Sequence, residues 1–289
     1  MSRLLITGAN GFIGSHFVRY FSSRHEVVAL SRTEPNRLPE GSSWRHYTLE
    51  EGADSTAFEG GDYLIHCALA TYSRRNANAG ALNAAATAWL SGMCRRNNYR
   101  RFVFLSSLSA HPGVRSHYGQ SKLAIQSALD PSQDLILRPG LVIGQGGLFA
   151  RMVDVMESSR FLPLIDGGRQ AIQTVSIDDL CRVTDALLAA GSTGAYDIAS
   201  APSTSLFEIY EQIAGRLDRK PAYVYVPFAV AFAALRVAEA LGLPTPLNSE
   251  NLLGLKYGRT VPTSDFELNF GISLRSPRES IDDSLEARD

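Results

Sequence analysis

The chain has 289 residues, of which 45% are hydrophobic and 20% are charged, and its formal net charge is −1. This composition provides enough apolar material for a full core, and the length suits one large domain or two closely joined lobes. The near-neutral charge gives no sign of a nucleic-acid or acidic-membrane partner, so we expect a small-molecule substrate.

The first fourteen residues predict a dinucleotide-binding turn. An apolar run at residues 4–7 leads into Gly8-Ala9-Asn10-Gly11-Phe12-Ile13-Gly14 and then into an amphipathic stretch. In a strand–turn–helix unit, the first glycine allows a tight turn, the second lets a pyrophosphate approach the backbone, and the third lets the helix pack closely. The N–H groups at the helix start attract phosphate. The spacing is GxxGxxG rather than the usual GxGxxG.

The N-terminal half alternates short apolar runs with helical patterns. The expected strands cover residues 26–30, 44–49, 62–66, 101–105 and 134–138, and the expected helices cover residues 74–97 and 118–129. This alternation predicts an α/β fold with a doubly wound parallel sheet of the Rossmann type. Ligands in such sheets bind beyond the carboxyl ends of the strands, here after Thr7, Leu30, His66, Leu105 and Arg138.

The pattern loosens after Pro139. We expect helices over residues 148–159 and 178–190, and strands over residues 173–177 and 223–226. The sequence therefore predicts a dinucleotide-binding domain of residues 1–145 and 173–200, and a small, mainly C-terminal substrate lobe of residues 146–172 and 201–289.

The most apolar later stretch covers residues 227–243. Arg236 and Glu239 interrupt it, so it is too short and too charged to span a bilayer. It predicts an amphipathic helix with at most weak membrane association.

The three cysteines, Cys67, Cys94 and Cys181, are odd in number and far apart, and they form no zinc-type cluster. We expect buried free thiols in a reducing cytoplasm and no metal site. The chain enters a strand directly after its first residues, so we expect no signal peptide.

A tyrosine and a lysine carry the chemistry. Lysine occurs only three times, yet Lys122 lies four residues after Tyr118 at a predicted helix start, so the two share a helix face. A phenol has a pKa of about 10, and a nearby cation brings it toward neutral pH. The preceding stretch Ser106-Ser107-Leu108-Ser109-Ala110 can supply a hydroxyl that holds a substrate oxygen. The sequence predicts proton transfer by Tyr118.

The stretches TGANGFIG, SSLSA and YGQSK together resemble the short-chain dehydrogenase/reductase family, in its extended and atypical branch of NAD(P)-dependent epimerase/dehydratase-like proteins. The matches GDYLIHCA at residues 61–68, LRPGLVIG at 137–144 and VSIDDL at 175–180 extend the resemblance over residues 1–200.

The resemblance implies a role for each matching residue. Ser107, with Ser106 and Ser109 as alternatives, would orient the substrate; Tyr118 would be the acid/base; Lys122 would tune it and bind the nicotinamide ribose. Other matching positions would contact the adenine ribose and pyrophosphate or the nicotinamide. The expected cofactor-binding residues are Gly8, Asn10, Gly11, Phe12, Ile13, Gly14, Ser31, Arg32, Ala68, Leu69, Ala70, Tyr118, Lys122, Pro139, Leu141 and Val142.

The end of the second strand favours NADP over NAD. An acidic residue there binds the ribose 2′-hydroxyl of NAD, whereas an arginine accommodates the 2′-phosphate of NADP. Here Ser31 stands in the acidic position and Arg32 follows it. An arginine can pair with a phosphate through two hydrogen bonds.

The residues after Ser107 favour a reductase. The resemblance implies that dehydratases carry an Asp-Glu pair there, whereas this chain has Leu108-Ser109. We therefore expect NADP-dependent reduction of a ketone by hydride transfer, with a 4-keto sugar nucleotide as the first candidate substrate. Polyketide-like or terpenoid ketones stay open, with an apolar pocket lined by Phe149, Phe161, Tyr223 and Tyr225.

Two other functions stay open, an NAD-dependent sugar-nucleotide epimerase and a non-catalytic dinucleotide-binding accessory or sensor protein. The resemblance further implies a homodimer formed through the helices at residues 74–97 and 118–129.

Overall fold

The computed structural model describes residues 1–72, 76–243, 245, 247–262 and 266–288. The chain forms two compact units. Unit 1 consists of Met1–Pro112, His117–Arg138 and Leu180–Tyr196, and unit 2 consists of Gly113–Ser116, Pro139–Asp179 and Asp197–Asp289.

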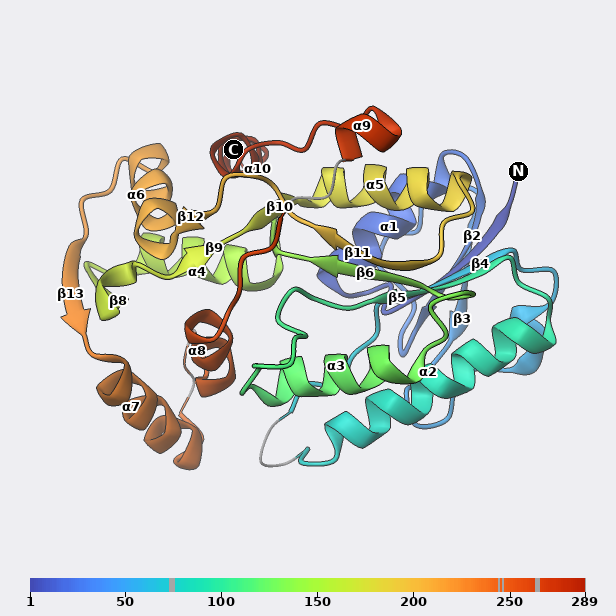
Figure 1. Ribbon diagram of the computed structural model, residues 1–289, viewed down its shortest axis with the longest axis horizontal. Helices are drawn as coiled ribbons and strands as arrows, with labels where there is room; N and C mark the ends of the chain where they lie inside the picture. The colour runs from blue at the N-terminus through green and yellow to red at the C-terminus, as the bar shows by residue number, and fades with distance from the viewer. Residues whose placement is uncertain (73–75, 244, 246, 263–265, 289) are drawn as a thin grey trace. The chain divides into compact units, whose positions relative to one another are not determined.

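A seven-stranded sheet forms the centre of unit 1 (Figure 1). Its spatial order is β11-β6-β5-β4-β1-β2-β3, and the pairings among β1 to β6 are parallel. The order reverses between β1 and β4, as in a doubly wound dinucleotide-binding sheet, so the predicted Rossmann-type fold is confirmed. The strands are β1 Arg3–Thr7, β2 Glu26–Ser31, β3 Ser42–His46, β4 Tyr63–His66, β5 Arg101–Leu105, β6 Leu135–Pro139 and β11 Gly194–Ile198.

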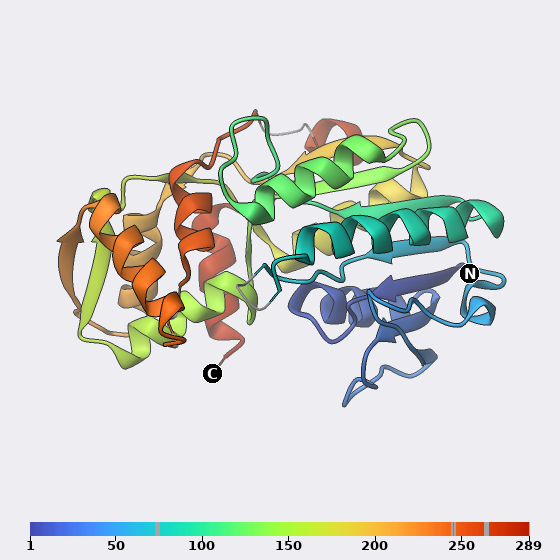
Figure 2. The same cartoon turned by 90° about the horizontal axis from the view of Figure 1, so that it is seen from below.

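Helices cover both faces of this sheet. In Figure 1, α1 and α5 lie above it and α2 and α3 below it, and Figure 2 shows α2 and α3 side by side. Because both faces are covered, central residues such as Leu5, Val28 and Leu64 are fully buried. The helices are α1 Phe12–Ser22, α2 Ala79–Arg96, α3 His117–Ala128 and α5 Ile177–Ala189, and a short 3-10 helix, η1, covers Ser55–Phe58.

Two predicted boundaries in this half are wrong. The predicted helix over residues 74–97 begins at Ala79, because Asn76 and Asn78 are poor helix formers and precede the alanine run; residues 74 and 75 lie outside the described residues. The third strand ends at His46 rather than at residue 49. Beyond it, reciprocal backbone hydrogen bonds of 3.1 and 3.0 Å between Thr48 and Gly52 turn the chain.

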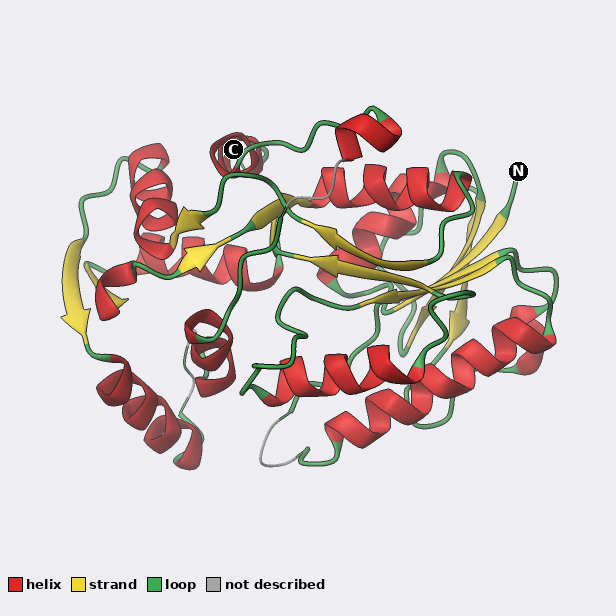
Figure 3. Ribbon diagram, viewed as in Figure 1, coloured by secondary structure: helices red, strands yellow, loops and turns green. Residues whose placement is uncertain are grey.

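Unit 2 is built from helices and three small two-stranded sheets, as the secondary-structure colours of Figure 3 show. Its strands pair as β7 with β10, β8 with β13 and β9 with β12. The strands are β7 Leu141–Ile143, β8 Phe161–Ile165, β9 Ala171–Ile172, β10 Thr174–Ser176, β12 Thr204–Ser205 and β13 Ala222–Val226. The helices are α4 Gly147–Ser158, α6 Leu206–Arg216, α7 Phe228–Ala240, α8 Ser249–Lys256, α9 Phe266–Phe270, α10 Pro277–Glu286 and the short 3-10 helix η2 Asp166–Gly168.

The core of unit 2 contains Phe149, which packs with Leu162, Ile209 and Ile281. The prediction that Phe149 lines an apolar substrate pocket is therefore wrong, because its place on the inner side of α4 makes it core. Phe161 and Tyr225 are each 66% exposed.

Cysteine burial agrees in part with the prediction. None of the three cysteines, all of which lie in the described part of the chain, is in a disulfide; Cys94 and Cys181 are buried, and Cys67 is half-buried. Among the described residues no helix is long and apolar enough to cross a bilayer.

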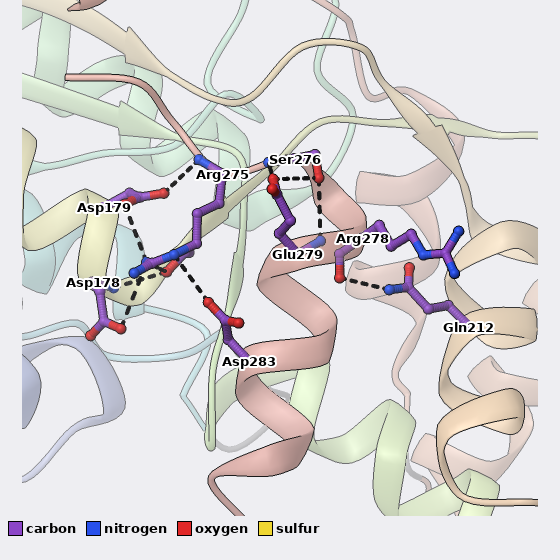
Figure 4. Close-up of polar contacts among 9 residues, drawn as sticks. Asp178, Asp179, Gln212, Arg275, Ser276, Arg278, Glu279 and Asp283 are labelled. Atoms are coloured by element: carbon purple, nitrogen blue, oxygen red, sulfur yellow. Dashed lines mark hydrogen bonds and ion pairs between the residues drawn. The ribbon is translucent and has the colours of Figure 1, made fainter. Parts of the chain in front are cut away.

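An ion-pair network attaches α10 to the start of α5 and to β10 (Figure 4). The backbone N–H of Arg275 donates to the fully buried Asp179 carboxylate at 2.8 Å, and the Arg275 guanidinium donates to the same carboxylate at 3.2 Å and to the Ser176 hydroxyl at 3.0 Å. Its Nε lies 3.0 Å from Asp283 on α10. Burial of a carboxylate is unfavourable without such partners, so Arg275 stabilises this junction.

We expect Arg275→Ala to destabilise the protein by roughly 2–3 kcal/mol, because it removes the cation from a buried carboxylate. The measurement is urea unfolding at neutral pH. Arg278→Ala is the matched control: Gln212 binds only the backbone carbonyl of Arg278, at 2.7 Å, so this variant should lose less than about 0.5 kcal/mol. Equal losses in the two variants would contradict the role of Arg275.

Candidate active site

The glycine-rich turn after β1 depends on two of its glycines. Gly8 has a φ of +69°, and a Cβ there would lie 2.8 Å from the backbone nitrogen of Ala68. A Cβ at Gly14 would lie 2.2 Å from the carbonyl oxygen of Gly8, which no side chain could accommodate. Gly11 caps α1, so the first N–H groups of the helix, from Phe12 and Ile13 onward, follow the turn directly.

The end of β2 is attached to this turn by polar contacts. The Asn10 side-chain amide donates to the Thr33 carbonyl at 2.7 Å. The hydroxyl of the buried Ser31 donates to the same carbonyl at 2.8 Å and accepts a hydrogen bond from the Trp44 indole at 3.1 Å. Arg32, between them, is exposed, and its carbonyl lies 3.0 Å from His46 Nδ1. The Arg32 side chain therefore lies at the surface beside the turn.

Thr7 joins the carboxyl ends of β1 and β4. Its hydroxyl oxygen accepts the backbone N–H groups of Cys67 at 3.1 Å and Ala68 at 3.2 Å, and it lies 2.7 Å from Nδ1 of the buried His66. Since both lone pairs of the oxygen are used, the hydroxyl hydrogen donates to Nδ1, and the neutral imidazole carries its own hydrogen on Nε2. Burial, and secondarily the charge of Lys122, lower the pKa of His66 to about 3.

The segment after β4 is positioned by Asn83 on α2. The Asn83 amide accepts the Ala70 N–H at 2.8 Å and donates to the Ala70 carbonyl at 2.9 Å. Asn83 is buried, so this paired contact fixes the backbone of the predicted cofactor-binding residues Ala68, Leu69 and Ala70. Sequence analysis did not identify Asn83; a polar residue in an otherwise alanine-rich helix was the available signal.

Ser107 and Tyr118 meet at the carboxyl end of β5. The Ser107 hydroxyl accepts the Ser109 backbone N–H at 3.1 Å and hydrogen-bonds the Tyr118 phenol. Burial raises the pKa of Tyr118, and the hydrogen bond from Ser107 opposes that rise. The tyrosine residue as a whole is 39% exposed, but burial around its hydroxyl group still raises the pKa. Ser106 is buried and accepts a hydrogen bond from the Gln126 amide, so of these two serines only Ser107 contacts the phenol.

Lys122 lies one helical turn beyond Tyr118 on α3 and is buried. Its ammonium donates to the Leu105 carbonyl and lies 4.5 Å from the centre of the Phe104 ring. Burial lowers its pKa to about 8, with a small opposing effect of Cys67. A buried ammonium that is still mostly charged at neutral pH is available to anchor a ribose hydroxyl.

The predicted nicotinamide-binding residues Pro139, Leu141 and Val142 lie in unit 2, at and just before strand β7. The Leu141 N–H donates to the Gln173 carbonyl at 2.9 Å, and β7 pairs with β10. Gly140 allows this close approach, because a Cβ there would lie 2.3 Å from the Gln173 carbonyl oxygen.

Two histidines precede the tyrosine. His111 is buried. His117 is exposed, and its ring stacks on Tyr72 with the centroids 3.9 Å apart.

The turn in unit 1 fits a dinucleotide. Gly8 and Gly14 allow the turn to pack closely against the chain's own backbone, and the α1 N-terminus after Gly11 supplies N–H donors and a partial positive charge. Among the described residues no group of three His, Cys, Asp or Glu side chains is arranged to hold a metal ion.

Comparison with known proteins agrees with this geometry. The family model described as "NAD dependent epimerase/dehydratase family" matches residues 4–199. The chain belongs to this family. The matched residues include the glycine turn, Ser107, Tyr118 and Lys122, and members use a dinucleotide of the NAD(P) type.

Individual relatives of the chain are distant. The dTDP-4-dehydro-6-deoxy-D-allose reductase of a Streptomyces species is 26% identical over 265 residues, covering 75% of this chain and 81% of the relative. The ceramide reductase of Caulobacter vibrioides is 32% identical over 163 residues, covering 49% of this chain and 46% of the relative. The solved structure of MoeE5 in complex with UDP-glucose and NAD is similar in fold, with a TM-score of 0.73 at 20% identity, covering 99% of this chain and 98% of that one.

The environment of His66 predicts an acid-sensitive fold. Its folded-state pKa of about 3 lies below the value of 6.5 for the unfolded chain, so unfolding takes up a proton between these values. Stability from this site is full above pH 6.5 and is lost as the pH falls toward 3, by up to about 1.4 kcal/mol per pH unit. Urea unfolding at a series of pH values between neutral and acid measures this slope. His66→Gln, which can still accept from Thr7, should have a shallower slope; an unchanged slope would contradict the assignment.

Proposed function

We propose that this protein is an NADP-dependent reductase that reduces a ketone by hydride transfer. The observation that carries the proposal is the hydrogen bond between Ser107 and Tyr118 at the carboxyl end of β5, with Lys122 one turn further along α3. Unit 1 would hold the dinucleotide, and unit 2 would supply most of the substrate lobe.

The raised pKa of Tyr118 suits a proton donor. At neutral pH the phenol is protonated, so it can give its proton to the oxygen of a carbonyl as a hydride adds to the carbon. Ser107, held by the Ser109 N–H, would donate to the same oxygen and stabilise its developing negative charge. An epimerase or an oxidative enzyme begins with the opposite step, removal of a proton by the phenolate.

Bound NADPH would supply the hydride. Gly8, Asn10, Gly11, Phe12, Ile13 and Gly14 would hold its pyrophosphate, and Lys122 would hold the nicotinamide ribose. Ala68, Leu69 and Ala70 would lie along the adenine side, and Pro139, Leu141 and Val142 beside the nicotinamide.

The residue after Ser107 argues against dehydration. Leu108 is buried and apolar, so this position lacks the carboxylate that would remove a proton from the sugar or help to expel water. Reduction of a ketone, in contrast, would need no group beyond Ser107, Tyr118, Lys122 and the dinucleotide.

The relatives suggest two kinds of substrate. A reductase of a 4-keto sugar nucleotide matches across most of both chains, which supports a sugar-nucleotide ketone. A ceramide reductase matches over half of the chain, which supports a lipid ketone as a second class. We propose the first as the substrate to test, in a cytoplasmic homodimer formed through α2 and α3.

Tyr118→Phe should lower kcat by about 10²–10⁴-fold while the protein still binds NADPH, because only the proton donor is lost. The assay follows NADPH oxidation with dTDP-4-dehydro-6-deoxy-D-allose and with a long-chain ketone. Tyr20→Phe is the matched control, since it removes a phenol that binds Asp185 at 3.3 Å instead. Near wild-type turnover by Tyr118→Phe would refute the assignment, and NADPH binding without turnover of any carbonyl by the wild type would favour the non-catalytic reading.

Arg32→Ala should weaken NADPH binding by about tenfold or more and leave NADH binding unchanged, because only NADPH presents a 2′-phosphate to the guanidinium. Fluorescence titration of both nucleotides measures this difference. Arg19→Ala, which removes an exposed arginine from the end of α1, should change neither affinity. Tightly bound NAD in the purified protein, without preference for NADPH, would support the epimerase instead.

A further inference from the structure

Exposed apolar side chains collect on one part of unit 2. Most of the large hydrophobic side chains that are exposed in the described part of the chain lie on β8, β13, α7 and the residues after α7. We call this set the apolar surface; its members, each 45–69% exposed, are Phe161, Val224, Val230, Val237, Leu241 and Leu243. Soluble proteins rarely expose so many large apolar groups together unless something covers them.

Helix α7 is apolar on both of its faces. Its inner side packs Ala231, Phe228 and Phe232 against Ile165 and Leu252. Its outer side repeats apolar residues at helical spacing and is exposed, at positions Val230, Ala233, Ala234, Val237 and Leu241. A surface helix normally has a polar outer face, so this pattern is that of a helix with apolar material on both sides.

The outer face of the β8–β13 pair adds to the same surface. The strands are parallel with Phe161 opposite Ala222 and Pro163 opposite Val224, and all four residues are exposed. Since alternate residues of a strand point to the same side, these four share one face, and the other face carries buried Leu162 and Leu164.

The charges around the apolar surface are mainly basic. Arg160 precedes β8 and Lys220 precedes β13, and the Ala222 N–H donates to the Arg160 carbonyl at 2.8 Å, so the two cations lie at the same end of the strand pair. Both are exposed, and neither forms an ion pair within the residues that the structure describes. In the segment RLDRK at residues 216–220, Arg216 pairs with Asp282 and Glu286, so Arg219 and Lys220 remain beside the single acid Asp218.

The acidic residue of α7 is withdrawn from the outer face. Glu239 accepts hydrogen bonds from the Ser249 N–H at 2.6 Å and hydroxyl at 2.9 Å, and it lies 3.8 Å from Arg236. The exposed side of the helix therefore presents apolar groups and Arg236.

We propose that the apolar surface docks onto a lipid bilayer with anionic headgroups. Apolar side chains of a surface helix bury into the boundary between headgroups and acyl chains, and flanking cations add attraction to anionic lipids. Charge complementarity favours a bilayer over a second copy of the chain. A symmetric contact would pair this surface with itself, which brings Arg160 and Lys220 no carboxylate partner within the surface, whereas phospholipids supply the anion.

The first test is flotation of the wild-type protein with vesicles of phosphatidylcholine alone and of phosphatidylcholine with phosphatidylglycerol. We expect binding to the anionic vesicles, weaker binding at high salt and weak binding to phosphatidylcholine. Hydrogen exchange should slow in residues 223–243 when anionic vesicles are added. Absence of flotation with anionic vesicles would overturn the proposal.

Variants separate the apolar contribution to vesicle binding from the electrostatic contribution. Val230→Gln/Val237→Gln should lower the partition coefficient by about tenfold or more without a change of charge. Arg160→Gln/Lys220→Gln should lower it by about fivefold for each cation removed, with anionic vesicles only. Leu268→Gln, on exposed α9 outside the apolar surface, is the matched control and should bind as the wild type.

Two results would contradict a lipid partner even if the surface is functional. One is unchanged vesicle binding by Val230→Gln/Val237→Gln with an unaltered melting temperature. The other is a wild-type dimer in light scattering that this variant dissociates, together with absence of vesicle binding, which would assign the surface to a second copy. Neither test measures turnover, so the vesicle-binding and light-scattering results can be interpreted even if the ketone-reductase proposal fails.

Discussion

The close approach of two backbone segments at Gly8 and Gly14 is the constraint on which the dinucleotide-binding half depends. A Cβ at Gly14 would lie 2.2 Å from the Gly8 carbonyl oxygen, and a Cβ at Gly8 would lie 2.8 Å from the Ala68 nitrogen. The same turn thus brings α1 against β1 and the end of β1 against the segment after β4. Thr7 completes this junction with one hydroxyl that serves three partners. Gly8 and Gly14 are therefore required by the packing of the chain itself.

Burial shifts the pKa values of Tyr118 and Lys122 more than interactions with neighbouring side chains do. Burial raises the pKa of Tyr118 and lowers that of Lys122, and both effects favour the uncharged form. The Lys122 ammonium donates to the Leu105 carbonyl, and the phenol of Tyr118, whose pKa is raised, is protonated at neutral pH. The sequence argument expected Lys122 to lower the pKa of the phenol directly; in the structure the neighbour that lowers it is Ser107.

The parallel sheet and its order could be predicted because each strand is a short apolar run bounded by turns, and a glycine motif marks the first. The start of α2 could not be predicted from the sequence. The helical pattern of residues 74–97 includes asparagines, and whether an asparagine precedes a helix or lies within it depends on local capping. At the site, the sequence identifies Ser107, Tyr118 and Lys122 by spacing. It does not reveal Asn83, because the contact of Asn83 with Ala70 is a tertiary contact between a helix and a loop that no local spacing predicts.

The Ser31 hydroxyl has a consequence for altering nucleotide preference. It accepts from the Trp44 indole and donates to the Thr33 carbonyl, and Asn10 donates to that same carbonyl. An aspartate in its place could still accept the indole hydrogen, but its ionised carboxylate would have no hydrogen to donate to the Thr33 carbonyl, which lies 2.8 Å from the Ser31 hydroxyl. A change of residue 31 is therefore linked, through the Thr33 carbonyl, to the position of the loop that follows β2.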